Sequence, residues 1–123
     1  MKPIKVIQRL TEDEDKNNDI KSLANSIETI LHNCNADISY VDSYNTRDSF
    51  NEIEIGCKFA ADKLSKYSND VSLHGKLKFD ENLKLIESDL STSSGPNVLN
   101  YDFIKALNAL YSYFASGNKH YDL

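Results

Sequence analysis

The sequence predicts an α+β fold, in which three main helices pack on a small antiparallel sheet built around a β-hairpin over residues 71–90. Two kinds of pattern indicate this fold. Apolar residues alternate with polar ones from Val71 to Phe79, and the alternation resumes after Asp80-Glu81-Asn82, as in two strands joined by a turn. Asn82 is the residue expected to be left-handed in that turn. Elsewhere, apolar residues recur every three or four positions, which is typical of an amphipathic helix.

The N-terminal third predicts a strand, a loop and a helix. Residues 4–9 alternate weakly and are interpreted as a short opening strand, and residues 11–18 as a mobile acidic loop, because adjacent acids repel one another and paired asparagines favour turns. An acidic docking patch is the alternative for the loop. A helix capped by Asn18 or Asp19 then follows. Its apolar stripe consists of Ile20, Leu23, Ala24, Ile27, Ile30, Leu31 and Cys34.

The middle of the chain contains an ambiguous segment. Residues 38–41 predict a brief strand. Residues 50–67 fit two patterns: Ser49 and Glu52 resemble a capping box before residues at helical spacing, while residues 52–59 also alternate as in a strand. The length of the run and Ala60-Ala61 favour a helix, in which Glu54 and Lys58 would form a surface ion pair.

The C-terminal part predicts one more helix. Residues 91–96 form a connecting loop by composition, Asn100 can cap the helix, and Gly117 can end it. The face of this helix is Phe103, Leu107, Leu110 and Phe114, with Ile104 and Tyr111 beside it. We expect residues 1–123 to form one globular domain. Its most buried residues should include Ile27, Leu31, Leu77, Phe79, Leu107 and Leu110.

The negative charge is concentrated in one segment. The chain has a formal net charge of −5, and residues 37–62 contribute six acids against Arg47 and Lys58, a balance of −4. Tyr40, Tyr44, Phe50 and Phe59 lie in the same segment. An acidic surface with aromatic contact area suits a basic protein partner, and not a nucleic acid or an anionic membrane.

No pattern of catalytic or cofactor-binding residues is recognisable. The three histidines have no metal-ligand spacing, the four glycines are dispersed, and no nucleophile motif is present, so we expect no catalytic residue, metal or cofactor. Cys34 and Cys57 fall on apolar faces and are predicted to be buried, reduced thiols, with a disulfide as the alternative. The N-terminus lacks the apolar run of a signal peptide, which predicts a cytoplasmic protein.

These observations predict a protein-binding role without enzymatic activity. The leading hypothesis is an acidic neutralising protein of the immunity-protein, antitoxin or phage-inhibitor type, which masks a basic partner such as a nuclease toxin. The alternative is a small-ligand-binding domain or small enzyme with a pocket between helices and sheet. For the leading hypothesis, the expected partner-binding residues are Tyr40, Asp42, Tyr44, Asp48, Glu52, Glu54 and Tyr113.

Overall fold

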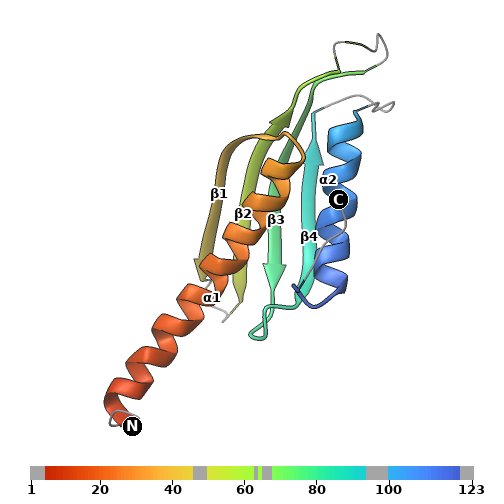
Figure 1. Cartoon of the computed structure of the whole chain (residues 1–123). Helices are drawn as coiled ribbons and strands as arrows, with labels where there is room; N and C mark the ends of the chain where they lie inside the picture. The colour runs from red at the N-terminus through yellow and green to blue at the C-terminus, as the bar shows by residue number, and fades with distance from the viewer. Residues whose placement is uncertain (1–4, 46–49, 63, 65–67, 94–99, 120–123) are drawn as a thin grey trace.

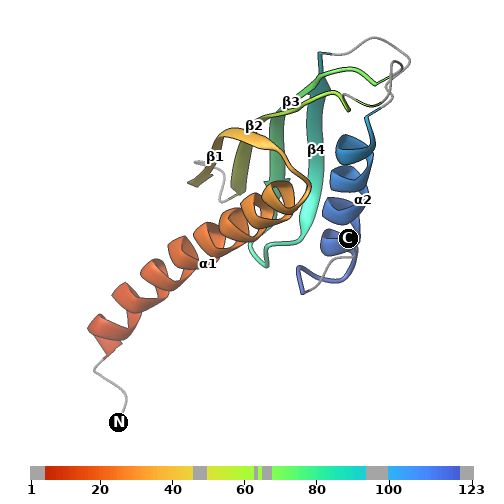
Figure 2. The ribbon, with the colours of Figure 1, turned by 45° about the horizontal axis from the view of Figure 1, so that its top comes forward.

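A computed structural model describes residues 5–45, 50–62, 64, 68–93 and 100–119, with the backbone alone for residues 5–18. The elements are α1 (Lys5–Asn33), β1 (Asp37–Asn45), β2 (Asn51–Phe59), β3 (Val71–Phe79), β4 (Leu85–Thr92) and α2 (Tyr101–Ala115). The strands form one antiparallel sheet in the order β1-β2-β3-β4. Both helices lie on the same side of this sheet, which leaves its other side open (Figures 1 and 2). The α+β class is confirmed, but the described residues form two helices, not three.

Residues 51–59, expected to form the third helix, are strand β2, so the helical interpretation was wrong there; residues 63 and 65–67 of the predicted helix lie outside the described residues. Ile53, Ile55, Cys57 and Phe59 are buried under the helices, and Glu54 and Lys58 point to the open side. β2 pairs with β1 on one side and with β3 on the other, and this pairing outweighs the helix propensity of Ala60-Ala61. The expected Glu54–Lys58 ion pair is also absent: the Lys58 Nζ atom lies 3.5 Å from the Asp70 Oδ2 atom instead.

The apolar stripe of α1 is confirmed, because every member from Ile20 to Cys34 is buried. The helix, however, begins at Lys5, so the opening strand, the loop over residues 11–18 and the cap at Asn18 or Asp19 were wrong. Residues 5–18 are rich in good helix formers, and a helix already fixed at one end extends through them at little cost. The N-terminal half of α1 extends beyond the sheet (Figure 1). Asn35, with a φ of 63°, ends the helix in a left-handed conformation.

The hairpin of β3 and β4 is confirmed, with a correction in its turn. The left-handed residue is Leu83, with a φ of 61°, and not Asn82. The Asp80 side chain determines this geometry, because its Oδ1 atom accepts hydrogen bonds from the backbone N–H groups of Asn82 (2.8 Å) and Lys84 (3.0 Å). In β3, Gly75 has a φ of +146°, and any Cβ there would collide with the backbone of Asp89 and Leu90 in β4.

Helix α2 closes the core and is anchored at its first turn by Asn100. This side chain is 2% exposed. Its Nδ2 atom donates to the carbonyl oxygens of Phe59 (3.2 Å), Ala60 (3.1 Å) and Asn69 (2.9 Å), and its Oδ1 atom accepts from the Phe103 N–H (3.0 Å). The predicted cap is therefore confirmed, and the same amide also joins α2 to the ends of β2 and of the segment before β3.

The face that α2 buries is rotated from the predicted one. Five of the six residues expected in the core are buried, and the exception, Leu107, is only partly buried. Ala106 and Tyr113 are buried where Leu107 and Phe114 were expected to be. The small residues Ala106 and Ala109 are fully buried at the centre of this face, and Leu107 lies at the edge of the core.

Candidate partner-binding face

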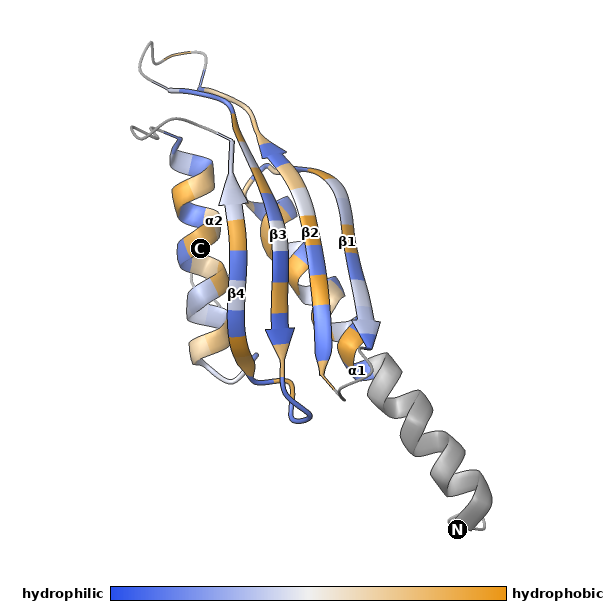
Figure 3. Ribbon diagram, turned by 180° about the vertical axis from the view of Figure 1, so that it is seen from behind, coloured by the Kyte–Doolittle hydropathy of each residue, from blue (hydrophilic) through white to orange (hydrophobic). Residues whose placement is uncertain are grey.

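The open side of the sheet brings five of the predicted partner-binding residues together. The antiparallel register places Asp42 opposite Glu54 and Tyr44 opposite Glu52, with Tyr40 opposite Gly56. We call the surface of Tyr40, Asp42, Tyr44, Glu52 and Glu54 the acidic–aromatic face. It lies on β1 and β2, where polar residues alternate with the apolar ones that point to the helices (Figure 3). On a helix, Glu52 and Glu54 would point to different sides, whereas a strand puts them on one side.

Tyr40 is held in place by Gly56. The Tyr40 ring lies across the strand pair, so close to Gly56 that a Cβ atom there would collide with it. Glycine in a strand often marks such a close approach, and an aromatic ring over it covers the exposed backbone. The Tyr40 side chain is 37% exposed, so one part of it packs on the sheet while another remains available for contact.

Carboxylates dominate the electrostatics at the β1 end of the open side. Asp42 and Glu54 are direct cross-strand neighbours of the same charge, which is unfavourable in an isolated sheet. The pKa of the nearby Tyr44 phenol is raised, chiefly by desolvation and then by the negative charges of Asp42 and Glu54. Tyr44 is 46% exposed and keeps its proton at neutral pH, so it offers a hydrogen-bond donor beside the acids.

Lysines on β3 lie in the middle of the same open side. Lys76 is opposite Glu54 and Asp89, and Lys78 is opposite Glu52 and Glu87. Each lysine therefore has a carboxylate neighbour on both sides, and the Lys78 Nζ atom also lies 4.1 Å from the centroid of the Phe50 ring. This row of residues was not predicted from the sequence. Alternation in residues 71–79 placed the lysines on the polar side of the hairpin, but the interpretation of β2 as a helix hid their acidic neighbours.

One predicted partner-binding residue, Tyr113, does not belong to this surface. Tyr113 is 6% exposed and lies on the buried side of α2, with its ring centroid 5.8 Å from that of Phe114. It was therefore wrongly assigned to the binding surface, because the rotation of α2 turns it into the core. Asp48 lies outside the described residues.

The cysteines are buried and are not bonded to each other, as predicted. Burial raises the pKa of the Cys57 thiol to about 11. Desolvation also raises the pKa of Cys34, partly opposed by the positive charge of Lys105. A thiol in this environment stays protonated at neutral pH and is a poor nucleophile.

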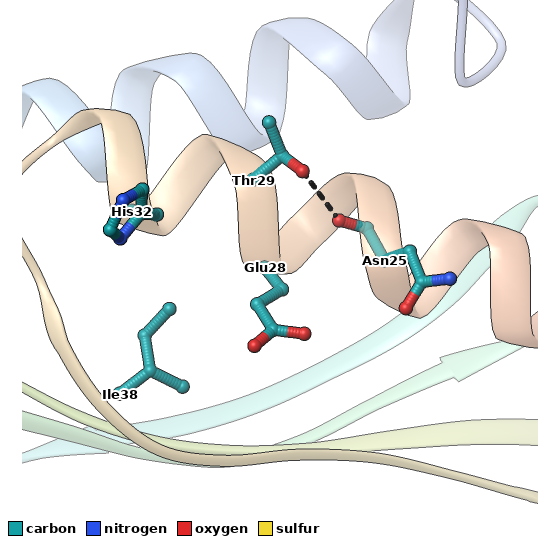
Figure 4. Close-up of a pocket in the computed structure, with 5 residues that line it drawn as sticks. All are labelled: Asn25, Glu28, Thr29, His32 and Ile38. Carbon is teal, nitrogen blue, oxygen red and sulfur yellow. Dashed lines mark hydrogen bonds between the residues drawn. The ribbon is translucent and has the colours of Figure 1, made fainter.

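A shallow hollow of about 330 Å³ lies between α1 and β1. Asn25, Glu28, Thr29 and His32 line it from the helix, and Ile38 lines it from the strand (Figure 4). Glu28 points toward β1, while the Thr29 hydroxyl donates to the Asn25 carbonyl oxygen at 2.9 Å. Four of its five lining residues have polar side chains.

Among the residues that the structure describes, no group of three or more histidine, cysteine or acidic side chains could hold a metal ion. Of the three histidines, His32 is on α1, His74 is on the open side of the sheet, and His120 lies outside the described residues. Neither helix, over its described part, has a stretch long and apolar enough to cross a membrane.

Comparisons of the chain with protein-family models, with curated proteins and with solved structures found no match. Functional inference therefore rests on the sequence and on the geometry of the open side.

Proposed function

We propose that the protein binds a basic protein partner through the acidic–aromatic face and masks it, as an immunity protein, antitoxin or phage inhibitor masks a nuclease toxin. The observation that carries this proposal is the placement of Asp42 directly opposite Glu54 on an open sheet surface. Like charges in this position disfavour the free protein. A lysine or arginine of a partner, placed between the two carboxylates, would turn this repulsion into attraction.

The surroundings of the two acids support the same role. Tyr40 and Tyr44 flank them and are partly exposed, and tyrosine supplies contact area with little loss of side-chain entropy. The positive charges of Lys76 and Lys78 are offset by acids on both neighbouring strands, so they weaken the negative potential at the β1 end only partly. This combination fits a cationic protein surface better than a nucleic acid.

The first test is capture of a partner by immobilised protein, with recovery compared between wild type, Asp42→Lys and Glu87→Lys. Glu87 is the matched control, because the same charge reversal then occurs on the open side but three strands away, at about 14 Å. We expect a basic protein to bind wild type and Glu87→Lys but not Asp42→Lys. Equal recovery by all three would refute the proposed face, and an acidic binding partner would refute the proposed chemistry.

Association kinetics then test the role of charge. Stopped-flow mixing of the captured partner at two salt concentrations should give slower and less salt-dependent association for Asp42→Lys than for wild type. Truncation of Tyr44 to alanine should mainly speed dissociation, because it removes buried contact and not long-range attraction. Circular dichroism of each variant checks that the fold is unchanged.

A further inference from the structure

The outer edge of β1 is an unpaired strand edge. Within the described part of the chain, β1 pairs with β2 alone, and no other segment bonds to the outer side of residues 37–44. Natural edge strands are commonly protected by lysine, proline or bulges. Residues 37–45 contain neither lysine nor proline, and the bulge between Ile38 and Tyr40 disturbs only one end. The backbone from Val41 to Tyr44 is therefore in a suitable conformation to accept another strand.

The open side and the helix side of this edge differ in shape, but both carry negative charge. On the open side, a strand added next to β1 would pass Asp42 and Tyr44. On the helix side, it would pass the hollow where Glu28 points toward the strand that carries Ile38 (Figure 4). Side chains of an added strand alternate between these two sides, so both sets of side chains would meet a carboxylate. A basic segment complements both sides, whereas a second copy of β1 would bring its own acids.

We propose that β1 accepts an extended basic segment of the partner as a fifth strand of the sheet. This inference rests on the proposed function and adds the mode of binding: backbone hydrogen bonds to the edge supply affinity, and the carboxylates on both sides select lysine or arginine. The added strand would place cationic side chains beside Asp42, whose direct cross-strand neighbour in the free protein is the acidic Glu54.

The experiment uses a fluorescent peptide of alternating lysine and threonine, about as long as β1, and measures its dissociation constant by anisotropy. Two further peptides carry N-methyl groups on the odd-numbered or on the even-numbered amides. In a paired strand, only alternate N–H groups face the neighbouring strand. We therefore expect one methylated peptide to bind at least about tenfold more weakly, because several hydrogen bonds of about 1 kcal/mol each are lost, and the other to bind within about twofold.

Matched protein variants locate the peptide. Asp42→Asn and Glu28→Gln remove one carboxylate from each side of the β1 edge. The alternating peptide carries all its lysines on one side, so only the variant on that side should weaken its binding severalfold, whereas both variants should weaken binding of a peptide of paired lysines and paired threonines, which presents lysines on both sides. Their controls are Glu87→Gln on the same open side and Asp19→Asn, exposed on the same helix about 14 Å from Glu28, and neither should change binding.

The outcomes separate strand addition from simple docking. Equal binding of both methylated peptides, or no binding of the unmethylated peptide, would overturn strand addition. The proposed function would then still be decided by the capture experiment with Asp42→Lys and Glu87→Lys. Weaker binding to Glu87→Gln than to Asp42→Asn would also overturn the proposal, because it would place the peptide at β4.

Discussion

Asn100 allows the sharpest test of the packing, because its side chain has two separable roles. The carbonyl part of the amide caps α2 through the Phe103 N–H, and the amino part supplies hydrogen bonds to three backbone carbonyls. Asn100→Ala removes both roles. Asn100→Ser keeps a side-chain oxygen suited to capping but removes the amino donors.

The expected losses follow from these contacts. A lost N-cap costs about 1 kcal/mol of unfolding free energy. A buried carbonyl that loses its partner costs about 1–3 kcal/mol, and this applies most fully to Phe59, since the bonds to Ala60 and Asn69 are only part-buried and water can replace them. We therefore expect Asn100→Ala to lose about 2–4 kcal/mol and Asn100→Ser about 1–3 kcal/mol.

Urea denaturation followed by circular dichroism measures both losses, with Asn108→Ala as the control. Asn108 is exposed on the same helix, and its replacement should change stability by less than about 0.5 kcal/mol. The reasoning would be refuted if Asn100→Ser were as stable as wild type, because the three carbonyls would then not need the amide. Equal losses for serine and alanine would show that the cap contributes nothing.

Four further predictions test other parts of the fold. Gly75→Ala should destabilise the protein by more than Gly117→Ala in urea denaturation, because a Cβ at Gly75 meets the β4 backbone whereas Gly117 has open space and only its φ of +76° to strain. Leu107→Ala should cost less than Leu110→Ala, about 1–2 against 2–5 kcal/mol, since only Leu110 is fully buried, and equal costs would contradict the rotation of α2. Both cysteines should react slowly with a thiol reagent in the native state and fully after unfolding. The pKa of Cys57 is raised to about 11 from 9.0, so the stability that the protonated thiol contributes is complete below pH 9 and is lost toward pH 11. The loss of stability at alkaline pH should therefore be smaller in Cys57→Ala than in wild type. The pKa of Asp70 is lowered, first by the hydrogen bond from the Ala61 N–H and then by Lys58, so stability should decline as pH falls through the acid range, and Asp70→Asn should lack this component in acid titration.

The parts of the fold that were predictable from the sequence are those whose apolar spacing fits either a helix or a strand, but not both. The stripe from Ile20 to Cys34 fits only a helix, and the alternation from Val71 to Phe79 fits only a strand. Residues 52–59 satisfy both patterns, and their state depends on β1 and β3, which lie elsewhere in the sequence. The residues of this segment do not themselves reveal those partner strands, so the helix propensity of Ala60-Ala61 decided the prediction.

The candidate site was predictable in its composition but not in its arrangement. The concentration of acids and tyrosines identified Asp42, Tyr44 and Glu54, and the structure brings them together. Their adjacency comes from the β1–β2 pairing, which the helical interpretation of residues 50–67 had excluded. Tyr113 was misplaced for another reason: α2 buries the face that carries Ala106 and Ala109, an arrangement that charge and aromatic content do not report.

The strand order has a consequence for how the chain folds. Every strand of the sheet bonds only to strands that precede or follow it directly in the sequence, so the sheet can form as successive hairpins without closing a long loop. Long-range closure is needed only when α2 docks, and the Asn100 amide then joins segments about 30 to 40 residues earlier in the chain. Mutations in the hairpin turns should therefore slow folding, whereas mutations at Asn100 should mainly speed unfolding.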